Sequence, residues 1–453
     1  MSKYRYSEGE QQLNNVLNYQ DVELKNIQRL DMHEVEKRIV DSEELLSSLG
    51  YSLHGTAKIE SVVPKKTIMI PTWEELCAEA EGKVGITTDL ESLFTEEELG
   101  NNEVALRRLN NEYNMIHKLD KIDYSISIAA GLLGAIVDIL LIGIPQKTPV
   151  GLKGGPLSNY VRDWFNKKFP EEEMQKLANA QESKVSYDAQ DNRNTKEYVT
   201  GLSAYYHRLL SLGHDPLLGF IIGVSDIMSG KMTTVDKTGK IVSQVMENYA
   251  DRKEANIFAA IAKQIIHLKS DITTSMGLPV PLMGLFNLFQ FGSIGEAEQT
   301  VAEIVQGMYY EGYDFIHFCS MSIPTMIVEV LIRIGYAFKR IKEGHSIKDS
   351  IPFSLNREKH PKLSTMLFLG HSTTTAVNAG KVYFTQNPVA INYPQWIAFT
   401  KYSYKQLKWA LLKKPELRDA YVRGIIKEEL YMVYDEINKD FDEYAEEYIV
   451  VIN

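Results

Sequence analysis

The sequence predicts a mainly α-helical protein, a large helical bundle with at most a small β-hairpin. Apolar residues recur at helical spacing in several long segments, whereas the alternation that is typical of half-buried strands is sparse. The chain has 453 residues, of which 44% are hydrophobic and 24% are charged. These values are ordinary for a globular protein with a well-buried core. Glycines inside the apolar segments allow helices to approach closely, so we expect glycine-containing helices at the centre.

The chain is expected to have three regions. Residues 1–120 are acidic in places and read as amphipathic helices, with Thr72 as a candidate N-cap for one of them. Residues 121–345 hold the apolar helical core and most of the histidines next to carboxylates. Residues 346–453 form a C-terminal helical region with aromatic and aliphatic residues at helical spacing and an acidic end.

The most apolar segment is 124–144, which reads YSISIAAGLLGAIVDILLIGI and contains one charged residue, Asp138. A helix of this length can cross a hydrocarbon layer of ~30 Å at ~1.5 Å per residue. A carboxylate in lipid costs ~2.5 kcal/mol or more, so Asp138 is expected to face protein, water or a cation. Two interpretations stay open: a membrane-embedded helix and a buried helix of a large soluble protein.

The rest of the core contains shorter apolar segments and polar connections. The polar stretch 170–195 is expected to be a linker or exposed excursion, and KMTTVDKTGKIV at 231–242 predicts a hairpin. Further apolar helices are expected at 217–228, 257–268, 278–291, 315–338 and 366–382.

Charge, cysteine content and the start of the chain exclude several classes. The net charge of −11 gives no electrostatic footprint for nucleic acid, so no nucleic-acid partner is expected. Cys77 and Cys319 lie far apart and form no disulfide framework. The first thirty residues are polar, so no signal peptide is expected. We expect a cytoplasmic or membrane-associated protein with membrane lipid as a candidate partner, and homo-oligomerisation is left open.

Histidines next to carboxylates are the main functional signal. His267 and Asp271 are four residues apart on a predicted helix and therefore share one face. A divalent metal ion can bridge such a pair, and mixed imidazole and carboxylate ligands suit Zn²⁺ or Mn²⁺. The alternative is a hydrogen-bonded pair within the helix. Asp138 is a further candidate ligand, because a buried acid needs a partner.

His207 and His214 form a second candidate pair. On an unbroken helix, seven residues separate them by ~10.5 Å, too far for one metal ion. We therefore expect a break in the helix, for which Gly213 and Pro216 are suited. Asp215 is expected to be a metal ligand or the catalytic base, the alternative being a helix cap.

The order of these residues resembles the membrane-bound metal-dependent hydrolases, which include the LexA-binding inner-membrane type of enteric bacteria. That family has an acid at the end of an apolar helix, a His-Arg dipeptide with a second histidine nearby, and His-x-x-x-Asp followed by Thr and Gly-x-Pro. The chain departs from it in having one acid where the family's first motif has two, and in the wider spacing of its first two histidines. The resemblance covers about 131–281, with matches at Asp138, His207, Arg208, His214, His267, Asp271, Thr274, Gly277 and Pro279.

Two functions are therefore expected. In the first, one or two metal ions held by Asp138, His207, His214, His267 and Asp271 activate water to hydrolyse an ester or phosphoester. The apolar surroundings favour a lipid-like substrate. In the second, the chain is a non-enzymatic membrane-inserting effector or scaffold, and the His/Asp pairs fix the packing of buried helices.

Overall fold

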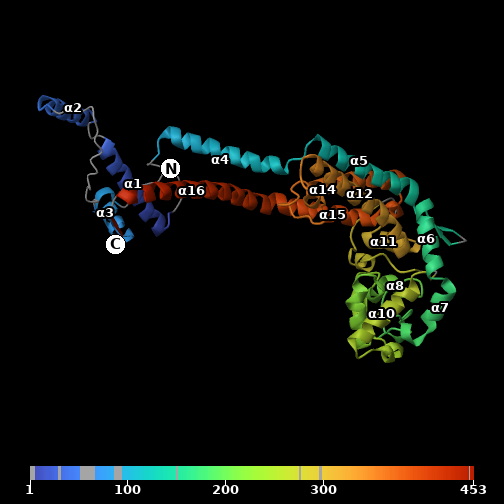
Figure 1. Cartoon of the computed structure of the whole chain (residues 1–453). Helices are drawn as coiled ribbons and strands as arrows, with labels where there is room; N and C mark the ends of the chain where they lie inside the picture. Colours follow the sequence, from blue (N-terminus) through green and yellow to red (C-terminus); the bar gives the residue numbers. More distant parts are fainter. Residues whose placement is uncertain are drawn as a thin grey trace. The chain divides into compact units, whose positions relative to one another are not determined.

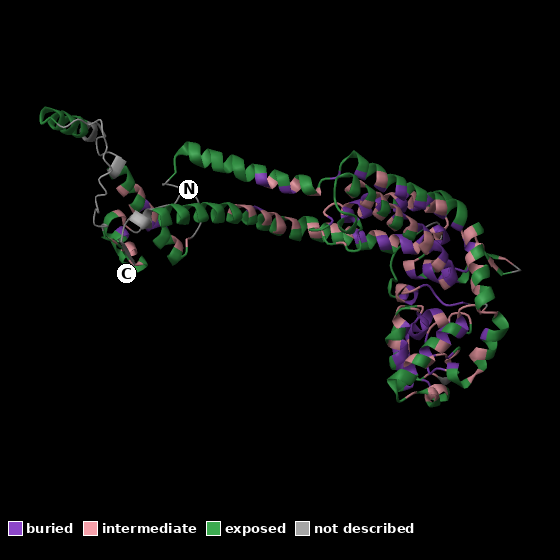
Figure 2. Cartoon of the chain, in the orientation of Figure 1, coloured by how far each residue is buried: buried purple, intermediate pink, exposed green. Residues whose placement is uncertain are grey.

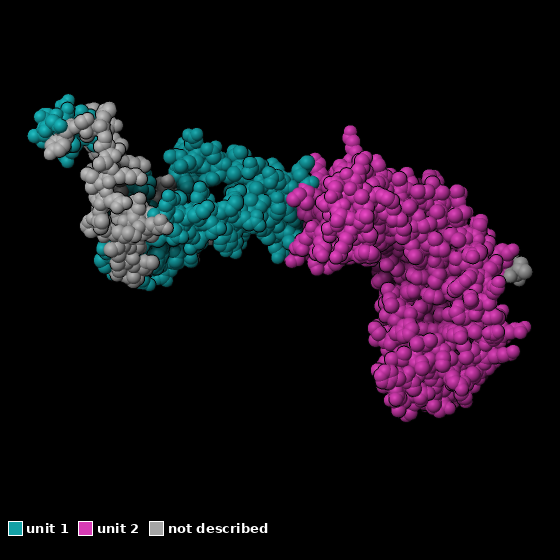
Figure 3. All heavy atoms as spheres, viewed as in Figure 1, with its two compact units in different colours: residues 1–115, 414–453 teal, residues 116–413 magenta. Residues whose placement is uncertain are grey.

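The structure is a computed structural model that describes residues 6–28, 32–50, 67–85, 94–148, 151–274, 277–294, 298–447 and 449–452 (Figure 1). It confirms the predicted mainly α class, because the strands in these ranges form only two-stranded sheets. The chain divides into two compact units (Figure 3). One unit comprises residues 1–115 and 414–453, and the other comprises residues 116–413.

The first unit brings together residues from the two ends of the sequence. α1 (Glu8–Gln28) packs against α3 (Trp73–Val84). Thr72 caps α3 as predicted, in a reciprocal capping box with Glu75. β1 (Thr67–Ile70) pairs in parallel with β6 (Ile449–Ile452). The unit also contains α2 (Met32–Ser48), most of α4 (Glu96–His117), and α16 (Lys414–Glu447), which is exposed along most of its length (Figure 2).

This division differs from the three regions that the sequence predicts. α14 (Leu363–Thr385) and α15 (Tyr393–Lys408) belong to the second unit, because they pack against α12 (Phe315–Lys342). Only the end of the chain, from residue 414, joins the N-terminal region. Compositional changes along the chain do not show which distant helices share a core.

The described residues contain more β-structure than the single hairpin that was expected. β4 (Lys231–Val235) and β5 (Ile241–Val245) form that hairpin. β2 (Gln146–Thr148) and β3 (Gly151–Lys153) form a second antiparallel pair, and β1 with β6 is the third pair in the described ranges. Three-residue strands and a pairing between distant segments produce no alternation that a sequence pattern can reveal.

Small residues allow α5 (Lys121–Val137) to pack closely on its neighbours in the second unit. A Cβ atom on Gly131 would lie 2.6 Å from the carbonyl oxygen of Gly370 on α14. A Cβ atom on Gly134 would lie 2.5 Å from Cγ2 of Val328 on α12. The side of α5 that carries these glycines therefore faces α12 and α14. The helix continues into the π-helical turn η2 (Asp138–Ile142).

Two helical stretches, Glu96–Ile142 and Phe315–Lys342, are long and apolar enough to cross a membrane by length and composition. Only 39% of the most apolar window is buried in each of them. These features are compatible with membrane association, and a core helix of a soluble protein can have the same length and composition.

A separate core of the second unit includes Tyr187, Leu210, Ile227 and Met232. α10 (Ile257–Asp271) packs against α7 (Glu171–Asn179) and α9 (Ile222–Ser229) beside this core. The other described helices of the unit are α6 (Pro156–Lys168), α8 (His207–Leu210), α11 (Val301–Tyr310) and α13 (Ile347–Ser350), with short 3₁₀ turns between them.

Candidate metal centre

Three segments that are distant in sequence bring histidines and aspartates together in the second unit. α10 supplies His267 and Asp271, α8 begins at His207, and a following 3₁₀ turn ends at His214. A loop residue, Asp188, completes the group, and we call these five residues the His/Asp cluster. Nε2 of His214 lies 3.1 Å from Nε2 of His267 and 3.7 Å from Oδ2 of Asp271. Nε2 of His207 lies 3.3 Å from Oδ1 of Asp188.

His214 occupies the middle of the cluster. One group of three ligand atoms comes from Asp188, His207 and His214, and another comes from His214, His267 and Asp271. Within each group all three atoms lie within 4.8 Å of one another. Because an imidazole nitrogen has one lone pair, Nε2 of His214 can coordinate one ion at a time. The arrangement therefore fits one divalent ion better than two.

Backbone carbonyl oxygens contact Nδ1 of two of the imidazole rings and fix the orientation of each ring. Nδ1 of His207 lies 2.8 Å from the carbonyl oxygen of Ala204, and Nδ1 of His267 lies 2.8 Å from that of Ser183. A carbonyl oxygen only accepts, so Nδ1 carries the proton and the lone pair is on Nε2. This tautomer is the one that coordination through Nε2 requires.

Several buried atoms of the cluster have no hydrogen-bond partner among the described residues. They are Nε2 of His207, Oδ2 of Asp271 and Nδ1 of His214. An unpartnered buried polar atom is costly. The first two atoms are acceptors, and each belongs to one of the two groups of three ligand atoms, so a cation bound by either group would satisfy one of them.

Two members of the cluster, His214 and Asp188, have shifted pKa values that favour the forms that bind a metal ion. Burial lowers the pKa of His214 to about 4, so this ring is neutral near pH 7. Burial raises the pKa of Asp188, but the neighbouring imidazoles of His207 and His214 outweigh that effect and hold the pKa well below its usual range. Neutral imidazoles and ionised carboxylates are the forms that bind Zn²⁺ or Mn²⁺.

Arg208 links the first turn of α8 to the end of α10. Its Nη2 lies 2.9 Å from Oδ1 of Asp271, which leaves Oδ2 on the side of the histidines. Its Nη1 donates to Oγ1 of Thr274 at 2.5 Å and lies 3.5 Å from the carbonyl oxygen of Gly277. The guanidinium therefore holds one carboxylate oxygen of Asp271 and fixes the direction of the other.

An aromatic ring closes the cluster on another side. The Tyr187 ring packs edge-on against His214 and His267, with centroids 5.0 and 5.4 Å away. Its hydroxyl donates to Oε1 of Gln264, and Nε2 of Gln264 donates to the carbonyl oxygen of Gly213. A Cβ atom on Gly213 would lie 2.6 Å from the Tyr187 ring. Gly213 is therefore required for close approach.

The expected helix break between His207 and His214 is present, but at a different residue. α8 ends at Leu210, and Ser211 is extended, with φ −82° and ψ 116°. The chain turns back there, and the rings of His207 and His214 come to 5.2 Å, centroid to centroid.

Asp138 lies outside the cluster, contrary to expectation. Its Oδ2 accepts from Nζ of Lys381 at 3.0 Å and from Nδ2 of Asn378 at 3.1 Å, and its Oδ1 accepts from Nδ2 of Asn392 at 2.7 Å. The buried acid does need a partner, as argued from the sequence, but a lysine supplies it. We therefore exclude Asp138 from the candidate site.

Asp215 is also excluded, because it acts as a cap. Its Oδ1 accepts from the backbone N–H groups of Leu217 and Leu218, at 2.9 and 2.8 Å. Its Oδ2 accepts from the backbone N–H of Leu282 at 2.5 Å. Both carboxylate oxygens are thus occupied by backbone donors, the alternative that the sequence left open.

Sequence reasoning did not identify Asp188, because it lies in the polar stretch that was expected to be an exposed linker. Val185, Tyr187 and Ala189 are all buried, with relative exposures of 1% or less. Their alternation is the signal that could have marked this loop as part of the core, with Asp188 between two core positions.

No family model, curated protein or solved structure matches this chain.

Proposed function

We propose that the chain is a metal-dependent hydrolase in which the His/Asp cluster binds one divalent ion, Zn²⁺ or Mn²⁺. One observation carries the proposal: three imidazoles and two carboxylates from three distant segments converge, with ligand atoms in groups within 4.8 Å. His207, His214 and His267 offer Nε2, and Asp188 and Asp271 offer carboxylate oxygens. The resemblance to the membrane-bound metal-dependent hydrolases supports the same set of histidines.

The ion would lower the pKa of a bound water toward ~7 and polarise an ester or phosphoester bond. Asp188 exposes 25% of its side chain, whereas each of the other four side chains exposes 5% or less. Substrate and water therefore approach from the side of Asp188. We assign this carboxylate, in place of Asp215, as a ligand or as the base that deprotonates the water.

A membrane-associated, lipid-like substrate is supported by the outward faces of two helices. Leu133 and Ile136 on α5 have relative exposures of 48% and 50%, and Met326 and Phe338 on α12 have exposures of 63% and 68%. Large exposed apolar surfaces are typical of protein or membrane contacts. The same surface favours the second candidate, a membrane-inserting effector or scaffold, in which the cluster is only a hydrogen-bonded network.

Metal analysis separates the two candidates. We expect about one Zn²⁺ or Mn²⁺ per chain, measured by plasma mass spectrometry on protein that has never been exposed to chelator. His267→Ala and Asp271→Ala should each lose most of the metal and the hydrolysis of a nitrophenyl ester or phosphodiester. His371→Asn, at a buried histidine outside the cluster, is the matched control and should keep both. A folded parent chain without stoichiometric metal would leave only the architectural role.

A further inference from the structure

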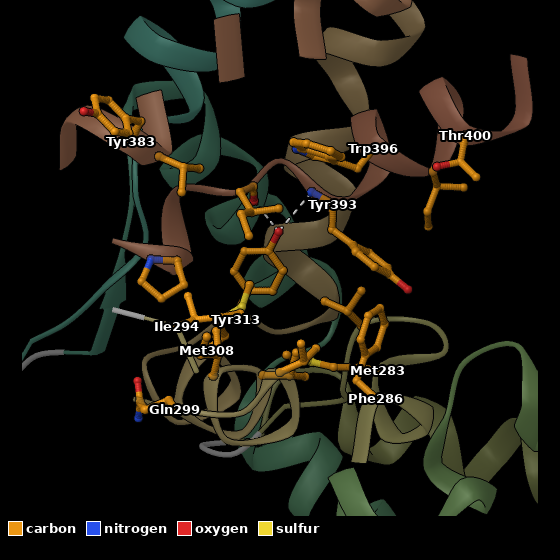
Figure 4. A pocket seen from close by; sticks show the side chains of 18 of the residues that line it. Met283, Phe286, Ile294, Gln299, Met308, Tyr313, Tyr383, Tyr393, Trp396 and Thr400 are labelled. Carbon is orange, nitrogen blue, oxygen red and sulfur yellow. Dashed lines mark hydrogen bonds between the residues drawn. The ribbon is translucent and has the colours of Figure 1, made fainter. Parts of the chain in front are cut away.

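A large cavity lies in the second unit, apart from the His/Asp cluster. Its volume is about 1240 Å³, whereas ligand pockets usually measure ~300–1,000 Å³. It is bounded by η8 (Met283–Leu288), α11, and the residues between the end of α14 and the middle of α15 (Figure 4). No member of the His/Asp cluster lines it.

The walls of this cavity are apolar and continuous with the core. Met283, Val305 and Met308 line the cavity and belong to a buried hydrophobic cluster. Phe286 and Trp396 add aromatic surface to its walls (Figure 4). Concave sites with mostly apolar walls are typical of sites that bind apolar ligands. An alkyl chain is the chemical class that such walls accommodate.

Hydrogen bonds hold the two sides of the cavity at a fixed separation. The Tyr313 hydroxyl donates to the carbonyl oxygen of Ile391 and accepts from the backbone N–H of Tyr393 at 3.0 Å (Figure 4). The ring of Tyr393 also lies 5.8 Å from that of Phe286, centroid to centroid. These contacts tie the segment at the start of α15 to Tyr313 and Phe286 and leave little of the protein for a ligand to order.

One positive charge stands at the edge of this apolar space. Lys401 is exposed and is the one charged residue among the described residues that line the cavity. Within the described ranges it forms no ion pair, and the neighbouring lining residue, Thr400, offers a hydroxyl. An apolar interior with a cation at its edge is complementary to a long-chain molecule that ends in an anion.

We propose that this cavity binds one long-chain fatty acid, with its alkyl chain between η8 and α11 on one side and the end of α14 and first half of α15 on the other, and its carboxylate at Lys401. The site is independent of the His/Asp cluster, so binding requires no metal ion. It goes beyond the proposed hydrolysis, because a chain without hydrolytic activity would still bind the fatty acid.

Fluorescence titration of the full chain with cis-parinaric acid tests the proposal. We expect saturable binding of one molecule per chain, competition by palmitate, and the same affinity with and without chelator. Methyl palmitate should compete about fivefold more weakly than palmitate, as expected for the loss of one partly exposed ion pair. Lys401→Gln should remove this preference, whereas Lys405→Gln, one turn further along α15 and outside the lining, should keep it.

A second variant tests the location of the alkyl chain. Ile304→Trp places a larger side chain in the cavity and should weaken binding at least tenfold, with helical content and thermal midpoint measured alongside. Binding of many molecules per chain that this variant leaves unchanged would show adsorption to the exposed apolar helices and would overturn the proposal. Absence of saturable binding would overturn it as well. Neither result bears on the metal content.

Discussion

Four buried histidines of the second unit have different partners. His207, His214 and His267 face carboxylates and one another, and carbonyl oxygens occupy the outer nitrogens of two of them. His371, in contrast, stacks on Tyr402 and contacts the amide of Gln395. A sequence shows the residue type, but the partners that decide between ligation and packing come from other segments.

At the residue scale, Arg208 is predicted to be essential for the position of Asp271. The two side chains expose 12% and 3%, so the pair is buried and removal of one partner leaves a charge uncompensated. Arg208→Met should lower the free energy of unfolding by about 3 kcal/mol or more and should also lower metal affinity. Urea denaturation and metal titration measure these effects. Lys240→Met removes an exposed pair with Glu197 and should change neither quantity.

Gly213 is a second residue whose substitution has a calculable effect. A Cβ atom there would overlap the Tyr187 ring, so Gly213→Ala should cost about 1–3 kcal/mol and displace the ring that packs on His214. Gly307→Ala is the matched change on α11, where no atom of the described residues lies within 4 Å of the added Cβ, and it should stabilise the protein slightly. Equal effects of both substitutions, measured by thermal unfolding, would contradict the close contact.

At the scale of elements, the sequence predicted helices better than it predicted which helices meet. The spacing of apolar residues anticipates α10 and places His267 and Asp271 on one face of it. The break between His207 and His214 also follows from the distance that one metal ion allows. Asp138 and Asp188 could not be assigned, because the partner of a buried carboxylate depends on tertiary packing. Asp138 pairs with Lys381, 243 residues away.

Substitution of Asp138 tests how strongly the end of α5 is attached to α14. It lies at the end of α5, and its bonds to Lys381 and Asn378 attach that end to α14. Asp138→Ala should lower the free energy of unfolding by about 3–5 kcal/mol, since it leaves the Lys381 charge without its partner. Metal content should not change. A loss of metal at unchanged stability, measured on the same preparation, would return Asp138 to the candidate site.

At the scale of the whole molecule, stability depends on pH through buried groups that act in opposite directions. Burial lowers the pKa of His371 to about 4 and raises the pKa of Asp226 to about 6. The ordinary values are ~6.5 and ~3.9. Between pH ~4 and ~6.5 the unfolded chain binds a proton at His371 that the folded chain does not, so acid lowers stability. Between pH ~4 and ~6 the folded chain binds a proton at Asp226 that the unfolded chain does not, so acid raises stability.

These two contributions should nearly cancel in the parent chain, and single substitutions should reveal each of them. Relative to the parent, Asp226→Asn should gain stability as the pH rises from 4 to 6, by about 1.4 kcal/mol per pH unit, because the carboxylate no longer has to ionise in a buried site. Relative to the parent, His371→Asn should lose stability as the pH rises from 4 to 6. The variant lacks the buried imidazole that makes the parent less stable in acid, so its advantage over the parent disappears as the pH rises. Urea denaturation of metal-free protein at half-unit pH steps measures both slopes, and the double variant should return to the parent's profile. Parallel profiles for the parent and both single variants would mean that neither group titrates with a shifted pKa, and the acid sensitivity of the fold would then have to come from other carboxylates.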